Sequence, residues 1–277
     1  MVTGKEVIFH LAAQVAVTTS VADPKTDFEI NAQGTLNLLE AVRKVNPGAI
    51  VIYTSTNKVY GGMEGVHVVD RRDSYDYEKG GKGISELEPL DFHSPYGCSK
   101  GAADQYMRDY SRIYGLKTMV FRMSCIYGPK QFGNGDQGWV AHFIISSIFN
   151  QPLTIYGDGK QVRDILYIDD LLDAFECSIE NIDKTKGKIY NMGGGRERSI
   201  SLLQLISKIE KRLNKKVNYL FSDWRPGVQK VYISDTEAFE REIGWRPKVS
   251  VDEGIDRLFS YVEEKKALFT SINSLYK

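Results

Sequence analysis

The segment Val51-Ile52-Tyr53-Thr54-Ser55-Thr56-Asn57-Lys58-Val59-Tyr60-Gly61 begins with apolar and β-branched residues and continues into a cluster of hydroxyls. Such a run predicts a strand that is buried on both faces of a parallel sheet. In open α/β sheets, ligands bind at the carboxyl ends of the strands, which is where these hydroxyls are expected to lie. Thr56 is therefore a candidate to hydrogen-bond a reacting hydroxyl group.

Strand and helix signals alternate on both sides of this segment. Strands are predicted at residues 7–11, 50–54, 117–122, 153–156 and 188–191, and helices near 27–44, 95–114, 138–149, 169–179, 202–213 and 251–265. Ser201 and Gln204 have the spacing of a capping box. Residues 61–87 are polar and are expected to be irregular. The alternation predicts a parallel, doubly wound sheet.

A second informative segment is Ser94-Pro95-Tyr96-Gly97-Cys98-Ser99-Lys100, where Ser94 and Pro95 are typical of a helix start. Because four residues make about one helical turn, Tyr96 and Lys100 share one face. An ammonium beside a phenol is expected to lower the pKa of the phenol, which creates a general base for an alcohol. Taken alone, the spacing more often belongs to a half-buried Tyr and a solvated Lys than to a catalytic pair.

The composition limits the classes of partner. The chain has 277 residues, 42% of them hydrophobic, which is enough for one large domain or a large and a small one. Its 36 basic and 36 acidic residues balance, so we expect neither a nucleic-acid nor a membrane-surface partner. Cys98, Cys125 and Cys177 show no metal-binding spacing and fit a reducing cytoplasm, so no metal is expected.

Together these segments resemble a known family. The hydroxyl-rich strand end, the Val-Tyr-Gly at residues 59–61 and the Tyr-x-x-x-Lys helix are similar to the extended short-chain dehydrogenases/reductases, the NAD-dependent nucleotide-sugar epimerases and dehydratases. The resemblance continues through residues 121–129, 156–164 and 190–194, and covers about residues 7 to 262. Residues 55–61, 90–106 and 136–140 resemble one branch, the CDP-paratose 2-epimerases (CDP-tyvelose 2-epimerases), which serve lipopolysaccharide O-antigen synthesis.

The resemblance implies an α/β fold, a Rossmann-like doubly wound parallel sheet with a smaller α/β substrate-binding lobe. Residues 1–128 are expected to form a partial NAD-binding domain, and residues 129–277 mainly the substrate-binding lobe, with some segments returning to the core. The Gly-rich turn and ribose-binding acid of an NAD site have no counterpart before residues 7–11. We therefore expect the sequence to be N-terminally truncated by roughly 60–75 residues, with the first βαβ units missing. The edge beside residues 7–11 is then expected to be open and apolar, and NAD to bind the chain weakly.

The same resemblance assigns roles around the cofactor. It implies a catalytic set of Thr56, Tyr96 and Lys100, in which Tyr96 is the base, Lys100 lowers its pKa and holds the nicotinamide ribose, and Thr56 shares the proton of the reacting hydroxyl. The implied cofactor-binding residues, besides Tyr96 and Lys100, are Leu11, Ala12, Ala13, Gln14, Asn31, Thr54, Met123 and Ser124. For Asn31 the alternative is a structural role in ordering the neighbouring loop.

A further set of residues is implied to contact the substrate. Its members are Thr56, Asn57, Lys58, Gln131, Gln137, Trp139, Arg163 and Arg225. Arg163 and Arg225 match positions that hold the substrate diphosphate, for which permanently charged, planar groups are suited. The alternatives are surface salt bridges for the two arginines and core packing for Trp139.

The resemblance finally implies a reaction. The dehydratase branch carries an acid pair directly after the Thr, where this sequence has Asn57 and Lys58, so elimination of water is disfavoured. What remains is NAD-dependent epimerisation of a nucleotide sugar, with CDP-paratose to CDP-tyvelose through transient oxidation at C2 as the expected case. The alternatives are a non-catalytic remnant or partner subunit, and a UDP-sugar 4-epimerase. We expect a cytoplasmic homodimer or homotetramer, paired through the helices near residues 27 and 95, where Ala32, Gly97, Gly101 and Ala102 allow close packing.

Overall fold

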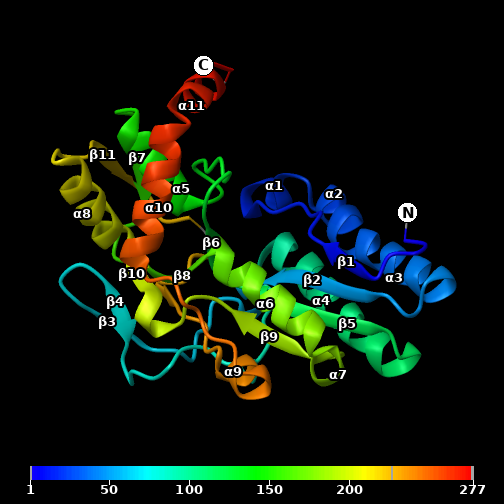
Figure 1. Ribbon diagram of the computed structural model, residues 1–277. Coiled ribbons are helices and arrows are strands. Elements are labelled where there is room, and N and C mark those ends of the chain that lie inside the picture. The colour runs from blue at the N-terminus through cyan, green and yellow to red at the C-terminus, as the bar shows by residue number, and fades with distance from the viewer. Residues whose placement is uncertain (1, 226, 276–277) are drawn as a thin grey trace.

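A parallel four-stranded sheet forms the centre of the computed structural model, which describes residues 2–225 and 227–275 (Figure 1). Its order is β1-β2-β5-β9, and the strands are β1 (Val7–His10), β2 (Ile50–Thr56), β5 (Lys117–Met123) and β9 (Ile189–Met192). All three pairings are parallel, with Ile52 opposite both Phe9 and Met119. The predicted α/β fold with a parallel sheet is confirmed.

Helices cover both faces of this sheet. Leu39 and Val42 on one helix, and Ala103 and Met107 on another, pack against one face at Val51. The other face is covered by a second core that includes side chains of α6 and α9. These helices are α2 (Pro24–Phe28), a π-helical turn η1 (Glu29–Gln33), α3 (Gly34–Val45), α4 (Ser94–Tyr114), α6 (Ile168–Glu180), α7 (Ile182–Thr185) and α9 (Glu237–Ile243). The predicted helix near residues 27–44 is thus formed by α2, η1 and α3 in succession.

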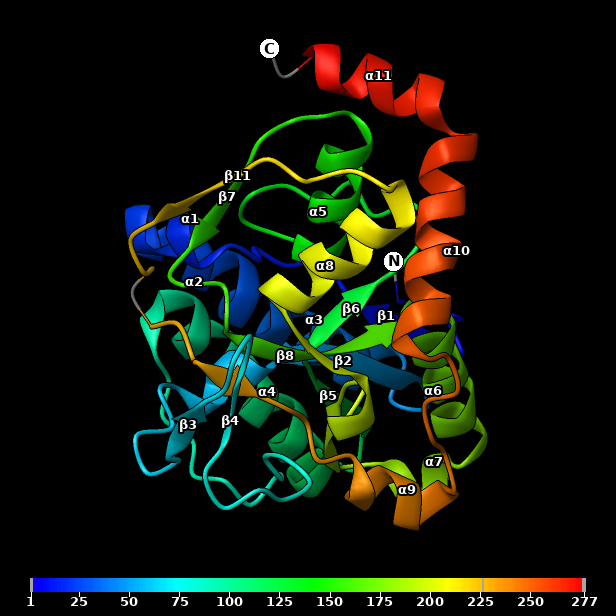
Figure 2. The same cartoon turned by 90° about the vertical axis from the view of Figure 1, so that its left-hand side faces the viewer.

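The second lobe is built from short strands and three packed helices (Figure 2). Its strands are β6 (Cys125–Tyr127), β7 (Leu153–Tyr156), β8 (Val162–Tyr167), β10 (Ser199–Ser201), β11 (Tyr219–Ser222) and β12 (Val231–Tyr232). Its helices are α5 (Trp139–Ile148), α8 (Leu202–Leu213) and α10 (Val251–Glu264), followed by α11 (Lys266–Leu275). Ile144, Leu205 and Phe259 from α5, α8 and α10 meet in one core. The capping box of Ser201 and Gln204 is confirmed at the start of α8.

Several elements escaped the sequence prediction. Residues 61–87, expected to be irregular, contain a hairpin of β3 (Val68–Asp70) and β4 (Tyr75–Tyr77). The hairpin contacts the second lobe, where the Tyr75 hydroxyl donates to Asp158 at 2.5 Å and Arg196 pairs with Asp76. A short helix α1 (Val17–Ala22) follows β1, and 3-10 turns η2 (Asn57–Tyr60) and η3 (Arg196–Arg198) follow β2 and β9.

The outer edge of β1 is open. Among the described residues β1 pairs only with β2, and Phe9 and Leu11 are 45% and 53% exposed. The expected open, apolar edge is therefore present. None of the helices in the described part of the chain has the length and apolar character needed to cross a membrane.

Helix α4 is tightly seated at its start. The Ser94 hydroxyl accepts a hydrogen bond from the Gly97 amide at 3.3 Å, the capping contact expected there, and Gly115 ends the helix in the left-handed conformation. A Cβ at Gly101 would lie 2.3 Å from the Phe92 ring, and one at Gly97 would lie 3.3 Å from a backbone oxygen. The prediction that Gly97 and Gly101 face a second subunit is wrong, because both pack inside this chain.

Candidate active site

The predicted catalytic residues meet at the carboxyl end of β2. Thr56 ends that strand, and Tyr96 lies in the first turn of α4; both are nearly buried. The Thr56 hydroxyl hydrogen-bonds the Tyr96 phenol and also accepts the Lys58 amide at 3.2 Å. Lys100, one turn further along α4, is 3% exposed. A Tyr–Thr pair of this kind can share the proton of a bound hydroxyl group.

Lys100 does not point its charge at the phenol. Its Nζ donates to the Thr54 carbonyl at 2.7 Å and lies 4.2 Å from the centre of the Tyr53 ring. Burial lowers the pKa of Lys100 to about 7, against the opposing charges of Asp104 and Asp27.

The prediction that the pKa of Tyr96 is lowered is wrong for this state of the chain. Burial raises the pKa of Tyr96, and the hydrogen bond from Thr56 offsets this only in part. A buried phenol favours its neutral form because a low-dielectric surrounding disfavours the phenolate. Tyr96 therefore holds its proton here.

A buried hydrogen-bond network links α4 to η1 and to the loop after β1. Asn31 joins it to the loop after β1: its amide oxygen accepts the Gln14 backbone N–H at 2.9 Å, and its Nδ2 donates to the Gln14 carbonyl at 3.0 Å. The same Nδ2 lies within 3.2 Å of Asp27 and Ser99, whose hydroxyl donates to Asp27 at 2.5 Å. These contacts favour the structural role for Asn31, in which it orders the neighbouring loop.

The remaining predicted cofactor-binding residues lie at the ends of β1, β2 and β5. Leu11 and Ala12 are exposed after β1, and the buried Oε1 of Gln14 has no partner among the described residues. Ser124 is already engaged, because its hydroxyl donates to the backbone and the carboxylate of Asp164. Thr54 offers its carbonyl to Lys100, and Met123 ends β5.

These groups fit one end of the cofactor. A ring amide or ribose could use the free Gln14 oxygen and the hydrogen-bonding groups of Tyr96 and Lys100. The described residues form no Gly-rich strand-to-helix turn beside β1, so they supply no pyrophosphate cradle. The fit is therefore to the nicotinamide end.

The predicted substrate residues divide into two groups. Asn57 and Lys58 directly follow Thr56, and Arg163 on β8 donates to the carbonyls of Val162 and Gln229, both at 2.7 Å. Arg225 lies elsewhere: it pairs with Asp136 at 3.0 Å and stacks 3.8 Å from the centre of the Tyr156 ring. Arg225 thus forms a salt bridge, which was the predicted alternative to a contact with the substrate diphosphate.

Three further predicted substrate residues, Gln131, Gln137 and Trp139, lie between β6 and the start of α5. Gln131 donates to the Ile126 carbonyl at 3.1 Å, and Gln137 donates to the Val15 carbonyl at 2.6 Å. Trp139 donates to Cys125 at 3.3 Å and packs edge-on against Phe143 in the lobe core. Core packing is therefore the observed environment of Trp139.

Sequence reasoning missed two groups of buried residues. His10 shares a hydrogen bond with Thr35 at 2.8 Å and stacks near Tyr53; burial and the Lys100 charge lower its pKa to about 4. The second group joins Arg122, Asp104 and Tyr60 through direct hydrogen bonds. No pattern in the sequence pointed to this second group, because a charged residue in a helix is usually solvated.

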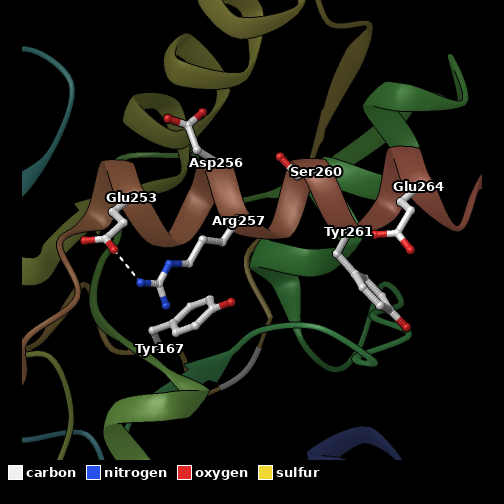
Figure 3. Close-up of a pocket in the computed structure, with 7 residues that line it drawn as sticks. All are labelled: Tyr167, Glu253, Asp256, Arg257, Ser260, Tyr261 and Glu264. Atoms are coloured by element: carbon white, nitrogen blue, oxygen red, sulfur yellow. Dashed lines mark hydrogen bonds and ion pairs between the residues drawn. The ribbon is translucent and has the colours of Figure 1, made fainter.

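Two surface hollows lie away from Thr56 and Tyr96. One, of about 620 Å³, runs along α10, where Arg257 pairs with Glu253 and lies over Tyr167 (Figure 3). The other, of about 420 Å³, is lined by Gly157, Asp158 and the aromatic segment 221–224. In the part of the chain that the structure describes, no group of three or more His, Cys, Asp or Glu side chains could hold a metal.

Comparison with known proteins places this geometry in a family. The model of the family described as GDP-mannose 4,6 dehydratase matches residues 3–258. The chain is 45% identical over 258 residues to CDP-paratose 2-epimerase of Salmonella typhi, covering 91% of this chain and 76% of that protein.

Two solved structures are similar throughout. UDP-glucose 4-epimerase of Thermotoga maritima, solved with UDP-glucose, has a TM-score of 0.80 at 31% identity and covers 94% of this chain and 78% of its own. UDP-glucuronic acid 4-epimerase of Bacillus cereus, solved with UDP-glucuronic acid and NAD, has a TM-score of 0.78 at 28% identity and covers 94% and 76%. The chain therefore belongs to the GDP-mannose 4,6-dehydratase family, the NAD-dependent nucleotide-sugar epimerases and dehydratases among the short-chain dehydrogenases/reductases.

Proposed function

We propose that this protein is an NAD-dependent epimerase that converts CDP-paratose to CDP-tyvelose by transient oxidation at C2. The observation that carries the proposal is the hydrogen-bonded Thr56–Tyr96 pair, followed directly by Asn57 and Lys58. The choice of a cytidine-linked sugar rests on the 45% identity to CDP-paratose 2-epimerase.

The residues of the chain supply binding and proton transfer. Thr56 and Tyr96 accept the proton of the sugar hydroxyl, and the same pair returns it when the ketone is reduced from the opposite face. NAD, when bound, accepts the hydride and gives it back. Lys100 must approach the phenol as a cation for Tyr96 to act as a base, since burial alone holds the Tyr96 pKa up.

Dehydration is the less favourable chemistry for this site. Elimination of water needs an acid and a base beside the reacting carbons. The Asn57 amide cannot serve as either, and it lies 3.4 Å from the Gln229 side chain. Among the described residues, the groups that act on Lys58 are Arg163 and Cys125, and neither is a carboxylate with which Lys58 could form an acid–base pair. Epimerisation needs neither group.

Two alternatives stay open to experiment. A UDP-sugar 4-epimerase is supported by the similarity to the Thermotoga maritima enzyme solved with UDP-glucose. A non-catalytic partner subunit is supported by the open edge of β1 among the described residues.

The direct test is turnover. We expect the protein, supplied with CDP-paratose and with NAD in large excess to offset its weak binding, to form the C2 epimer, because Thr56 and Tyr96 can move the proton while the cofactor stores the hydride. Nuclear magnetic resonance of the product identifies the inverted carbon. Inversion at C4 of a UDP-sugar would support the first alternative, and loss of water would contradict epimerisation.

We further propose a cytoplasmic homodimer, from which a homotetramer can be built. Tyr106 and Ile113 lie seven residues apart on α4, so they share one helix face, and they are 44% and 65% exposed. Phe28 and Ile30 on the adjoining α2 and η1 are 53% and 42% exposed. A surface of this kind is typical of a subunit interface.

Light scattering after gel filtration tests the dimer. We expect a mass of twice the 31.3 kDa of one chain, and Ile113→Glu is expected to return the protein to a monomer because it places a charge in the apolar face. Leu87→Glu is the control, because Leu87 is 92% exposed and lies outside α2, η1 and α4. A monomeric parent protein would contradict the proposal.

A further inference from the structure

The Lys100 ammonium is held by an aromatic ring and a backbone carbonyl. Its Nζ lies over the Tyr53 ring, 4.2 Å from the ring centre, and donates to the Thr54 carbonyl at 2.7 Å. Asp104 and Asp27 act on it through their charge, without a hydrogen bond to it. Because Lys100 is 3% exposed, its charge is costly unless nearby groups replace the lost water. The ring and the carbonyl are the groups that touch this charge in the described structure.

The packing of α4 on β2 fixes the ring under the ammonium. Tyr53 lies in the middle of β2, is 1% exposed, and shares one core with Ala103 and Met107 of α4. Ala103 and Met107 follow Lys100 by three and seven residues, so all three lie on one helix face. The helix face that packs on the strand therefore also brings the lysine over the ring.

The neighbours of the ring are uncharged at neutral pH. His10, the register partner of Tyr53 on β1, has its ring centre 5.2 Å from that of Tyr53. The Thr35 hydroxyl donates to the Asn31 carbonyl at 2.6 Å, so it accepts the 2.8 Å hydrogen bond from His10 Nε2. Burial and the Lys100 charge lower the pKa of His10 to about 4, which leaves Nδ1 without a proton at pH 7.

Tyr53 itself supplies no negative charge. Burial raises the pKa of its hydroxyl well above the usual value, so the phenol stays neutral. A neutral ring attracts a cation through the electron-rich face of its π system, most strongly where water is excluded. The contact between Tyr53 and Lys100 is therefore a buried cation–π interaction.

We propose that Tyr53 is a positioning residue for Lys100: the face of its ring, together with the Thr54 carbonyl, keeps the buried ammonium charged and in place. The catalytic use of that charge rests on the proposed function, whereas the contact between ring and ammonium does not. Lys100 is then ready as the cation that Tyr96 needs when the cofactor and the sugar bind.

Nuclear magnetic resonance of lysine labelled at Cε tests this without NAD or sugar. The Lys100 signal is the one that disappears in Lys100→Met, and its titration gives the pKa directly. Tyr53→Leu removes the ring but keeps the site apolar, so it should lower the Lys100 pKa, which is about 7, by about 1. Tyr53→Phe keeps the ring face and should keep the pKa.

Tyr190→Leu is the matched control. Tyr190 is 2% exposed and packs against Phe121 and Phe239 in the core on the other face of the sheet. The substitution removes the same ring from a core that does not contain Lys100, so the Lys100 pKa should stay unchanged. All variants share the other titratable neighbours of Lys100, which are His10 from β1, Asp27 from α2, and Tyr96 and Asp104 from α4.

A fluorine series separates the charge of the ring face from its packing. Phenylalanine with one, two or three fluorines is incorporated at position 53. Each fluorine withdraws electrons from the ring face while the shape stays nearly constant, so the Lys100 pKa should fall stepwise. This series decides the proposal even if Tyr53→Leu fails to fold.

Turnover with saturating NAD adds a pH-dependent readout. If the Lys100 pKa falls from about 7 to about 6, the charged fraction drops about fivefold at pH 7 but only about twofold at pH 6. Tyr53→Leu should therefore lose more turnover at pH 7 than at pH 6. A purely structural defect would lower both rates by the same factor.

The outcomes separate this proposal from the proposed function. A proton dissociation constant of Lys100 within about twofold of the parent in Tyr53→Leu, or unchanged across the fluorine series, would overturn the role of Tyr53. So would an equal change in Tyr190→Leu. A lowered Lys100 pKa with unchanged turnover would support the role of Tyr53 and contradict the use of the Lys100 charge in the reaction.

Discussion

Replacing Tyr96 by Phe is expected to lower the turnover of CDP-paratose by about 10²- to 10⁴-fold, the range that general acid–base groups contribute. The phenyl ring keeps the packing of Tyr96, which is 9% exposed, but it can neither take nor return a proton. The hydrogen bond to Thr56 is lost, which should lower the free energy of unfolding by only about 1 kcal/mol. Steady-state kinetics and urea unfolding of the same preparation measure both effects.

A control variant on the same helix distinguishes loss of the catalytic hydroxyl from a general disturbance of α4. Tyr114 is 48% exposed near the end of α4, so Tyr114→Phe should change neither turnover nor folding. Binding of CDP-glucose should be unchanged in both variants, because the Tyr96 hydroxyl is proposed to act only in proton transfer. Turnover of Tyr96→Phe within about tenfold of the parent, a difference of only ~1.4 kcal/mol, would mean that Tyr96 is not the base.

The Thr56–Tyr96 pair could be predicted because its signals are local. A continuous apolar run ends at Thr56, and the four-residue spacing places Tyr96 and Lys100 on one turn of a helix. Strand ends and helix starts meet at one edge of a parallel sheet, so the fold class brings these segments together. The sequence therefore contained the information for which residues meet.

The protonation of the same residues could not be predicted from spacing. Lys100 is held by the Thr54 carbonyl and the Tyr53 ring, contacts that follow from the packing of α4 on β2. Burial of Tyr96 then outweighs the hydrogen bond from Thr56, and the pKa moves in the direction opposite to the prediction. Desolvation depends on the whole surrounding structure, which a four-residue pattern does not encode.

Non-local contacts explain the other omissions. β3 and β4 are only three residues long, and they are stabilised by the second lobe through contacts such as Ser201 with the Asp73 carbonyl. Strands of this length carry too little alternation to be recognised. Asp104 was likewise unremarkable in the sequence, because a charged residue in a helix is usually solvated.

Asp104 forms the buried ion pair that fixes α4 to β5. Nε and Nη2 of Arg122 donate to its two carboxylate oxygens at 2.9 and 3.0 Å, and the two side chains are 0% and 3% exposed. Arg122 also donates from Nη1 to the Tyr60 hydroxyl at 3.1 Å, and that hydroxyl donates to Asn191 at 2.7 Å. The network therefore joins α4, β5, η2 and β9 one turn beyond Lys100.

Asp104→Ala is expected to lower the free energy of unfolding by about 3–5 kcal/mol, because it leaves the Arg122 guanidinium buried and unpaired. Urea unfolding measures the loss, and Asp109→Ala on the exposed side of α4 should stay within about 0.5 kcal/mol of the parent. The double variant Asp104→Leu/Arg122→Met removes both charges, so it should be more stable than Asp104→Ala alone. That recovery separates an unpaired charge from a packing defect, and it remains measurable if Asp104→Ala itself fails to fold. A loss below about 1 kcal/mol for Asp104→Ala would show that water reaches Arg122 and that the pair does not hold α4 in place.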